Sequence, residues 1–157
     1  MLGKLGTEQI ERLLQQECVG RIGCHAEGVT YVVPVTYWYD GQDVICHSAE
    51  GRKLRMMRKA PRVCFEVDRM RSMVDWESVI AQGIFEEIPA GEREEVLHTF
   101  SRWLKPRMPS TTSGAHGHGQ AAVLFRIHLT EKTGRFERPG EERGSSATQH
   151  ASPTGPA

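Results

Sequence analysis

Two runs rich in Val, Ile and Tyr near the N-terminus constrain the fold of this 157-residue chain most. They are VGRIGCHA at 19–26 and VTYVVPVTYWYD at 29–40, and only Glu27 and Gly28 separate them. β-Branched and aromatic residues favour strands, and a short turn-prone link between two such runs predicts a β-hairpin. Pro34 has no N–H to donate to a neighbouring strand. We therefore expect an edge or a bulge at that point.

The rest of the chain alternates further strand patterns with short amphipathic segments. We expect strands at 43–48, 62–68, 76–88 with a bulge or bend at Gly83, and 121–137 as a pair bending at Thr133-Gly134. We expect helices at 7–16 with Thr7 as a candidate N-cap, at 49–59 and at 90–104, and links at 69–75 and 105–119. Five or six sequential strands without regular βαβ alternation favour a mainly β fold, a small closed antiparallel barrel.

Domain organisation follows from composition. Residues 1–137 are predicted to form one domain. Residues 138–157 are rich in Gly, Pro, Ser and Glu, hold too little apolar surface to offset the entropy of ordering, and are predicted to be a disordered tail. We find no signal peptide and no apolar run near the ~20 residues of a membrane span, so we expect a cytoplasmic protein that does not bind a membrane.

Charge and cysteine content exclude several functional classes. The chain has 20 basic and 20 acidic residues, which gives no global electrostatic reason for nucleic acid as a partner. Its four cysteines are widely spaced with no CxxC pair, so reduced, structural thiols are expected. His116 and His118 lie in a Gly-rich loop without a further ligand at metal-binding spacing, and His25 and His128 lie in strand-like segments. We predict no metal site, and no nucleophile–base arrangement identifies a catalytic residue.

The stretch CHSAEGRKLR at 46–55 is a candidate anion site. Ser48 is a suitable N-cap for the helix expected from residue 49, and the amides of the first turn carry partial positive charge. Arg52 and Lys53 add two cations there, where cations are unfavourable to the helix itself. A terminal phosphate would compensate that placement. A capped helix with solvated basic residues explains the local pattern equally well.

Several segments taken together point to a family. VGRIGCH, YVVPVTYWYDG, HSAEGRK, APRVCFEVD and WESVIAQGIFEEI occur in this order between about Cys18 and Ile88. The set resembles the flavin-nucleotide-binding proteins related to pyridoxamine 5′-phosphate oxidase, most closely the branch that includes nitroimidazole-resistance proteins. The resemblance implies a six-stranded antiparallel split barrel that binds FMN at the interface of a homodimer.

The resemblance also implies which residues hold the flavin. The basic pair that binds the family's phosphate falls on Arg52 and Lys53, and the strand end near the ribityl and phosphate groups falls on His47 and Ser48. The strand beneath the flavin ring falls on Pro34, Val35, Thr36 and Tyr37. The family's later flavin contact falls on Ser78 beside Val79, and Trp76 is expected to cover part of the ring.

The same comparison limits the expected chemistry. The segments HTFSRWLKP, RMPSTTSGAHGHG and RFERPGEERG do not match the oxidase's grip on its vitamer phosphate, so oxidation of pyridoxamine 5′-phosphate is not expected. We expect electrons to pass from NADH or NADPH to a small nitroaromatic- or quinone-like acceptor. The alternatives are a flavin- or haem-binding module without turnover, since some split-barrel relatives bind haem, and a dimeric scaffold that binds nothing.

Overall fold

The barrel is built from antiparallel strands joined mostly by short turns. The computed structural model describes residues 1–108 and 122–139. The strands in those residues are β1 (Leu2–Lys4), β2 (Val19–Ala26), β3 (Val29–Tyr39), β4 (Asp43–Ser48), β5 (Arg62–Ser72), β6 (Asp75–Glu87) and β7 (Val123–Glu137). The helices there are α1 (Thr7–Gln16), α2 (Arg52–Lys59), α3 (Ala90–Leu104) and a turn of 3₁₀ helix, η1 (Lys105–Arg107).

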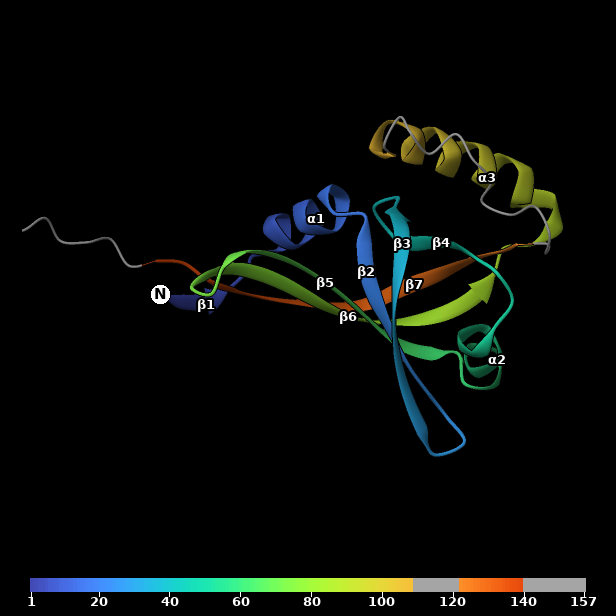
Figure 1. The fold of residues 1–157 in the computed structure, drawn as a ribbon, viewed down its shortest axis with the longest axis horizontal. Coiled ribbons are helices and arrows are strands. Elements are labelled where there is room, and N and C mark those ends of the chain that lie inside the picture. The colour runs from blue at the N-terminus through green and yellow to red at the C-terminus, as the bar shows by residue number, and fades with distance from the viewer. Residues whose placement is uncertain (109–121, 140–157) are drawn as a thin grey trace, which may run out of the picture.

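One pairing closes this sheet. The strand order is β1-β7-β4-β3-β2-β5-β6, and β6 also pairs with β7 along most of its length (Figure 1). Six strands therefore form a ring, while β1 adds to the far end of β7. This confirms the expected mainly β architecture, a six-stranded antiparallel split barrel.

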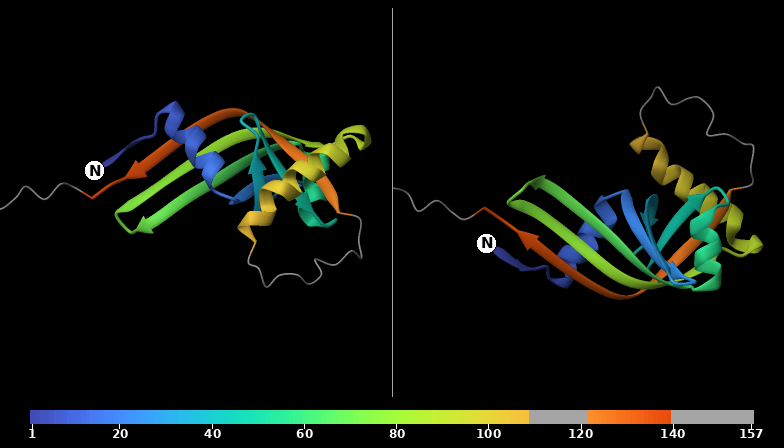
Figure 2. Two further views of the ribbon diagram at one scale, coloured as in Figure 1. Left: turned by 90° about the horizontal axis from the view of Figure 1, so that it is seen from above. Right: turned by 60° about the horizontal axis from the view of Figure 1, so that its bottom comes forward.

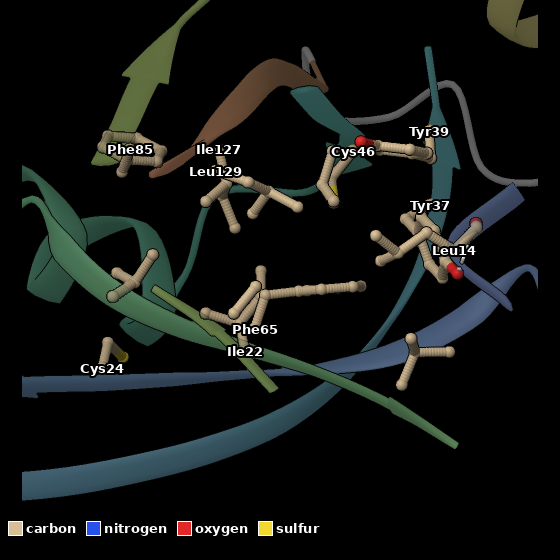
Figure 3. Close-up of a cluster of buried hydrophobic side chains, with 14 of the residues drawn as sticks. Leu14, Ile22, Cys24, Tyr37, Tyr39, Cys46, Phe65, Phe85, Ile127 and Leu129 are labelled. Atoms are coloured by element: carbon tan, nitrogen blue, oxygen red, sulfur yellow. Dashed lines mark hydrogen bonds between the residues drawn. The ribbon is translucent and has the colours of Figure 1, made fainter. Parts of the chain in front are cut away.

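The inner faces of the strands form the main core. Every second residue of β2, β5 and β6 is buried, which is the alternation expected of strands with one face inward. Tyr37 and Phe65 are both 0% exposed, and their rings meet edge-on with centroids 4.9 Å apart (Figure 3). The Tyr37 hydroxyl donates to the carbonyl of Leu14 at 2.9 Å. The core thus fixes α1 against β3.

A second, smaller core lies on the outside of the barrel. Phe100 of α3 is buried against Ile45 of β4, Leu124 of β7 and Ile88. Figure 2 shows α3 crossing the barrel wall at the end where β4 and β7 lie. Most of the remaining α3 side chains are exposed, so this helix is attached through a narrow apolar stripe.

Several sequence-based boundaries agree with the structure. The hairpin forms with β2 and β3 in continuous register, from Val19 opposite Thr36 to Ala26 opposite Val29. The chain's four cysteines are free thiols. A register shift between Gln82 and Gly83 in the β6–β7 ladder confirms the irregularity expected at Gly83.

Other boundaries need correction. The N-cap of α1 is Gly6, because its N–H donates to the side chain of Gln9 at 2.8 Å, and Thr7 is the first helical residue. Residues 69–72 continue β5 because they pair with β6 across a tight turn. Residues 123–137 form one strand rather than a pair, because β6 pairs with them along that length.

The remaining differences are smaller. β1 was not expected, since three residues carry no readable period, and Lys105–Arg107 is a 3₁₀ turn where a loop was predicted. The rest of that predicted loop, and the predicted tail from residue 140, lie outside the described residues. None of the helices in residues 1–108 and 122–139 is both long enough and apolar enough to cross a membrane.

Replacing Gly83 with Ala should destabilise the barrel at its closing ladder. An added Cβ would lie 2.5 Å from Cγ2 of Ile127 and 2.9 Å from the carbonyl oxygen of His128. We expect Gly83→Ala to lower the free energy of unfolding by about 1–3 kcal/mol in urea denaturation, the cost of overpacking. Gly91→Ala is the control, because a Cβ there meets nothing within 4 Å. Equal stability of the two variants would contradict this account of closure.

Candidate functional site

The connection from β4 to α2 forms one end of the candidate site. β4 ends at Ser48, and α2 begins only at Arg52, with Gly51 as a cap that offers no side-chain acceptor. The helix therefore starts three residues later than expected. Ser48 is not its N-cap, because its hydroxyl donates to the carbonyl of the next residue, Ala49, at 2.8 Å. The first-turn amides of α2 have no side-chain cap and no acidic residue in the first turn.

The basic residues of α2 fall into two groups. Arg58 pairs with Glu50 at 2.7 Å and also with Glu87, and hydrogen bonding from Arg58 holds the pKa of Glu50 below its ordinary value. Lys59 pairs with Glu27 at 2.7 Å. By contrast, Arg52 and Lys53 form no ion pair with any carboxylate in residues 1–108 and 122–139. Positive charge therefore remains uncompensated at the start of the helix.

The two unpaired cations differ in their surroundings. The Arg52 guanidinium lies 5.1 Å from the ring centroid of Tyr31 on β3, a cation–π contact that holds an exposed side chain beside that strand. Lys53 is half-buried near the end of β4. Burial raises the pKa of the Cys46 thiol, and the positive charge of Lys53 opposes that rise. Sequence reasoning missed Tyr31, because a contact between residues 21 positions apart leaves no local pattern.

Tyr31 belongs to a stretch of β3 that has an open edge. β3 pairs with β4 only over Tyr37–Tyr39, so in the described part of the chain residues 29–36 pair with β2 alone. Pro34 lies in this stretch, which confirms its expected edge position. An open edge offers backbone groups to a ligand. The edge, the end of β4 and the start of α2 therefore meet in one region of one chain.

The residues expected along the flavin ring divide by face. Pro34 and Thr36 are exposed on the outside of the barrel, while Val35 is half-buried toward the core. The Tyr37 side chain is wholly buried, and its N–H donates to the carbonyl of Cys18 at 2.9 Å. A ligand on this edge can therefore meet the side chains of Pro34 and Thr36 but not that of Tyr37. His47 is exposed on β4, with its ring 6.4 Å from that of Phe100.

The structure does not bring Trp76, Ser78 and Val79 near the start of α2 within one chain. Tyr31 is connected through the ladders to Gly83 of β6, and Ser78 lies five residues from Gly83. That is about 17 Å along the strand, besides three strand spacings of about 4.8 Å across the sheet. The Val79 side chain is fully buried, and the Trp76 indole N–H donates to Glu137 at 3.0 Å.

The outer face of the sheet joins these two regions. Pro34 lies opposite Arg21 on β2, and Arg21 forms ion pairs with Glu66 at 3.3 Å and with Asp68. Asp68 lies opposite Ser78. Burial raises the pKa of Glu66, Asp68 adds to the rise, and Arg21 opposes it. Sequence reasoning treated Glu66 and Asp68 as an unassigned carboxylate pair, and the structure shows that they share one arginine.

This outer face is also unusually apolar. Val19, Val32, Ile80 and Ile84 are exposed on it by 49%, 63%, 48% and 41%. A hollow of about 430 Å³ lies between Arg21, Val32 and Cys64 on the same face. Exposed apolar residues gathered on one face of a sheet mark an interaction surface.

The histidines do not form a metal centre in the described part of the chain. His25 contacts the Thr30 hydroxyl at 2.9 Å, and His128 contacts Asp43 at 2.7 Å. No group of three or more His, Cys, Asp or Glu side chains that could hold a metal occurs within residues 1–108 and 122–139. His116 and His118 lie outside the described residues.

Fold and site together define a split barrel with an uncompensated basic helix start beside an open strand edge. A family model described as pyridoxamine 5′-phosphate oxidase matches residues 6–136. The chain belongs to this family, as the sequence resemblance indicated.

Known relatives cover nearly the whole chain. It is 29% identical over 149 residues to an uncharacterised protein of Rhizobium meliloti, which covers 87% of this chain and 96% of that one. The crystal structure of a FAD-binding protein from Mesorhizobium loti is also 29% identical, with a TM-score of 0.74 over 88% of this chain and 99% of that one. A candidate 5-nitroimidazole resistance protein from Bacteroides thetaiotaomicron shares the fold at 20% identity and a TM-score of 0.66, covering 87% of each chain.

Replacing Ser48 with Ala tests whether α2 starts as described. Because the Ser48 hydroxyl does not cap the helix, Ser48→Ala should change the free energy of unfolding far less than the roughly 1 kcal/mol that a lost N-cap costs. Gly51→Ser is the matched variant, since it places a capping hydroxyl at the observed N-cap, and it should leave stability equal or slightly raised. Denaturant unfolding measures both variants. A loss near 1 kcal/mol for Ser48→Ala would return the cap to Ser48.

Proposed function

We propose that this protein is a homodimeric flavoprotein that carries electrons from NADH or NADPH to a small nitroaromatic- or quinone-like acceptor. The observation that carries the proposal is the unpaired Arg52–Lys53 pair beside the open edge of β3. FMN is the smallest ligand that satisfies both parts, because it joins a phosphate dianion to a flat ring with hydrogen-bonding edges. Membership of the family, and the FAD-binding relative at 29% identity, support the same ligand class.

The phosphate end has the groups that such an anion requires. Uncapped amides at a helix start, a guanidinium and an ammonium bind phosphate through charge-assisted hydrogen bonds. Arg52 is already held at Tyr31, so little side-chain entropy is lost when the anion binds. The Ser48 hydroxyl lies between the end of β4 and this helix start, where it can turn from Ala49 to the ligand.

The ring end would lie along the open edge of β3. Its backbone groups and the Thr36 side chain are available for polar contacts, and Pro34 presents an apolar surface without an N–H. His47, on the outer side of β4, lies at the ribityl side of this region. Once bound, the flavin supplies the hydride chemistry, and the protein positions it and shields it from water. No residue of this chain is assigned a proton-transfer role.

The second half of the site would come from a second copy. Ser78 and Trp76 are too far from Arg52 on one chain to reach the same flavin, but they lie on the outer face with Pro34. Face-to-face packing of two copies would cover Val32, Ile80 and the adjacent hollow. Each flavin would then be gripped by Arg52 and Lys53 of one protomer and covered by Trp76 and Ser78 of its partner.

The purified protein should be yellow and should release FMN or another flavin when it is denatured. Arg52→Ala/Lys53→Ala should lose most of that flavin, because each charge-assisted phosphate contact is worth about 1.5–3 kcal/mol. The control is Arg102→Ala/Lys105→Ala, which removes two exposed cations from the end of α3. Absorbance spectra of both proteins give the flavin content.

A colourless protein whose thermal stability is unchanged by added FMN would contradict the proposal, since a ligand that binds only the native state raises that stability. A haem spectrum that disappears when His25, His47, His116, His118 or His128 is replaced singly by Ala would instead establish the haem-binding alternative.

Two flavin-deficient variants should complement each other if the site is shared between protomers. Ser78→Trp is expected to fill the ring side of the site, whereas Arg52→Ala/Lys53→Ala removes the phosphate side. After unfolding, mixing in equal amounts and refolding, about one quarter of all sites should be intact, because half of the dimers are mixed and each has one undamaged site. Flavin absorbance of the dimer fraction measures this. Recovery of no flavin, with mixed dimers present, would contradict a shared site.

A further inference from the structure

A hollow continues from the phosphate end of the site along the side of α2. It has a volume of about 190 Å³ and lies between α2 and the turn that joins β2 to β3. Arg52 forms its near end, and Arg55 and Lys59 follow at one-turn intervals on the same side of the helix. In Figure 1 the β2–β3 hairpin projects from the barrel with α2 beside it.

The charge of this hollow is positive and is not needed for the first phosphate. Lys59 is balanced by Glu27 at 2.7 Å, and Glu27 is held at the turn with φ 52°. Arg55 forms no ion pair with a carboxylate of residues 1–108 and 122–139. Once Arg52 and Lys53 have compensated one phosphate dianion, Arg55 remains as a further cation about one helical turn, ~5 Å, away.

The remaining wall of the hollow is apolar. Ala26 and Met56 are buried, and Val29 is 42% exposed. A cation at one end and an aliphatic and thioether wall at the other suit a phosphate that carries a flat aromatic base. Methionine sulfur in particular packs favourably against aromatic rings.

The hollow also lies in line with the bound flavin. The open edge of β3 runs from Thr36, at the proposed ring end, past Tyr31 and Arg52 to Val29, which lines the hollow. A ligand that enters ring first along this edge places its phosphate at Arg52. Any group attached to that phosphate would then continue toward Arg55.

We propose that this chain binds its flavin as the dinucleotide FAD, with the second phosphate on Arg55 and the adenosine portion in the hollow between α2 and the β2–β3 turn. The proposal rests on the function proposed above and specifies its ligand. FAD is the flavin whose phosphate is extended in this way, through a phosphoanhydride to adenosine monophosphate. Arg55 is then the residue that distinguishes FAD from FMN.

The test compares ligands that share the first phosphate and differ beyond it. Apoprotein is titrated with FMN, FAD and riboflavin, and quenching of flavin fluorescence gives each dissociation constant. We expect FAD to bind at least about 10-fold more tightly than FMN, the range of one charge-assisted contact. Arg55→Ala and the size-conserving Arg55→Gln should remove most of that difference while changing FMN affinity by less than about 2-fold.

Arg12→Ala is the matched control, because Arg12 is an exposed arginine on the remote helix α1. It should leave the affinities for both flavins unchanged. Equal affinity of the unmodified protein for FMN and FAD, or an Arg55 effect of the same size on both ligands, would overturn this inference and leave the flavoprotein proposal standing. Failure of every flavin to bind would overturn both.

A last arm separates FAD from two ligands bound side by side. ADP is titrated into protein already saturated with FMN. We expect no binding that depends on Arg55, because the flavin and the adenosine are proposed to belong to one molecule. ADP binding to the FMN complex that Arg55→Ala abolishes would instead assign the hollow to a separate nucleotide and overturn the FAD proposal.

Discussion

The pairing of β6 with β7 is the constraint on which the rest of the molecule depends. It closes the barrel, and closure removes the exposed edges of every strand in the ring except where two neighbours differ in length. β4 is six residues long and β3 is eleven, so residues 29–36 keep an open edge in the described part of the chain. The chain that leaves the short β4 must turn into α2 at that place, which brings a helix start beside the open edge. The candidate site is a direct result of that mismatch.

Electrostatics then distinguishes this helix start from the other basic positions on the surface. Arg58 and Lys59 are paired with acidic residues, so they hold parts of the fold together. Arg52, Lys53 and Arg55 have no acidic partner within residues 1–108 and 122–139 and point to an anion from outside. The outer face adds a second requirement, because its exposed apolar residues and the remote Ser78 both call for another copy of the chain. A shared site between two protomers satisfies both.

Much of the fold could be predicted from the sequence, because its signals are local. The alternation of apolar residues gave the strands, and Glu27-Gly28 gave the hairpin turn. Pairing over long distances was not readable, so the single long β7 and the short β1 were missed or divided. The start of α2 was misplaced because Ser48 is a good N-cap by residue type, yet its hydroxyl bonds to Ala49. The clamp residues came from a resemblance, whereas the Arg52–Tyr31 contact and the Arg21–Asp68 pair required the structure.

The central claim is that Arg52 and Lys53 of one chain hold the phosphate of a flavin whose ring is covered by the partner. A crystal structure of the protein with its flavin tests this most directly. The account predicts the flavin's first phosphate within hydrogen-bonding distance of Arg52, Lys53 and the first amides of α2, with Ser78 and Trp76 of the partner subunit at the ring. A flavin whose phosphate lies away from α2, or one enclosed by a single protomer, would contradict it.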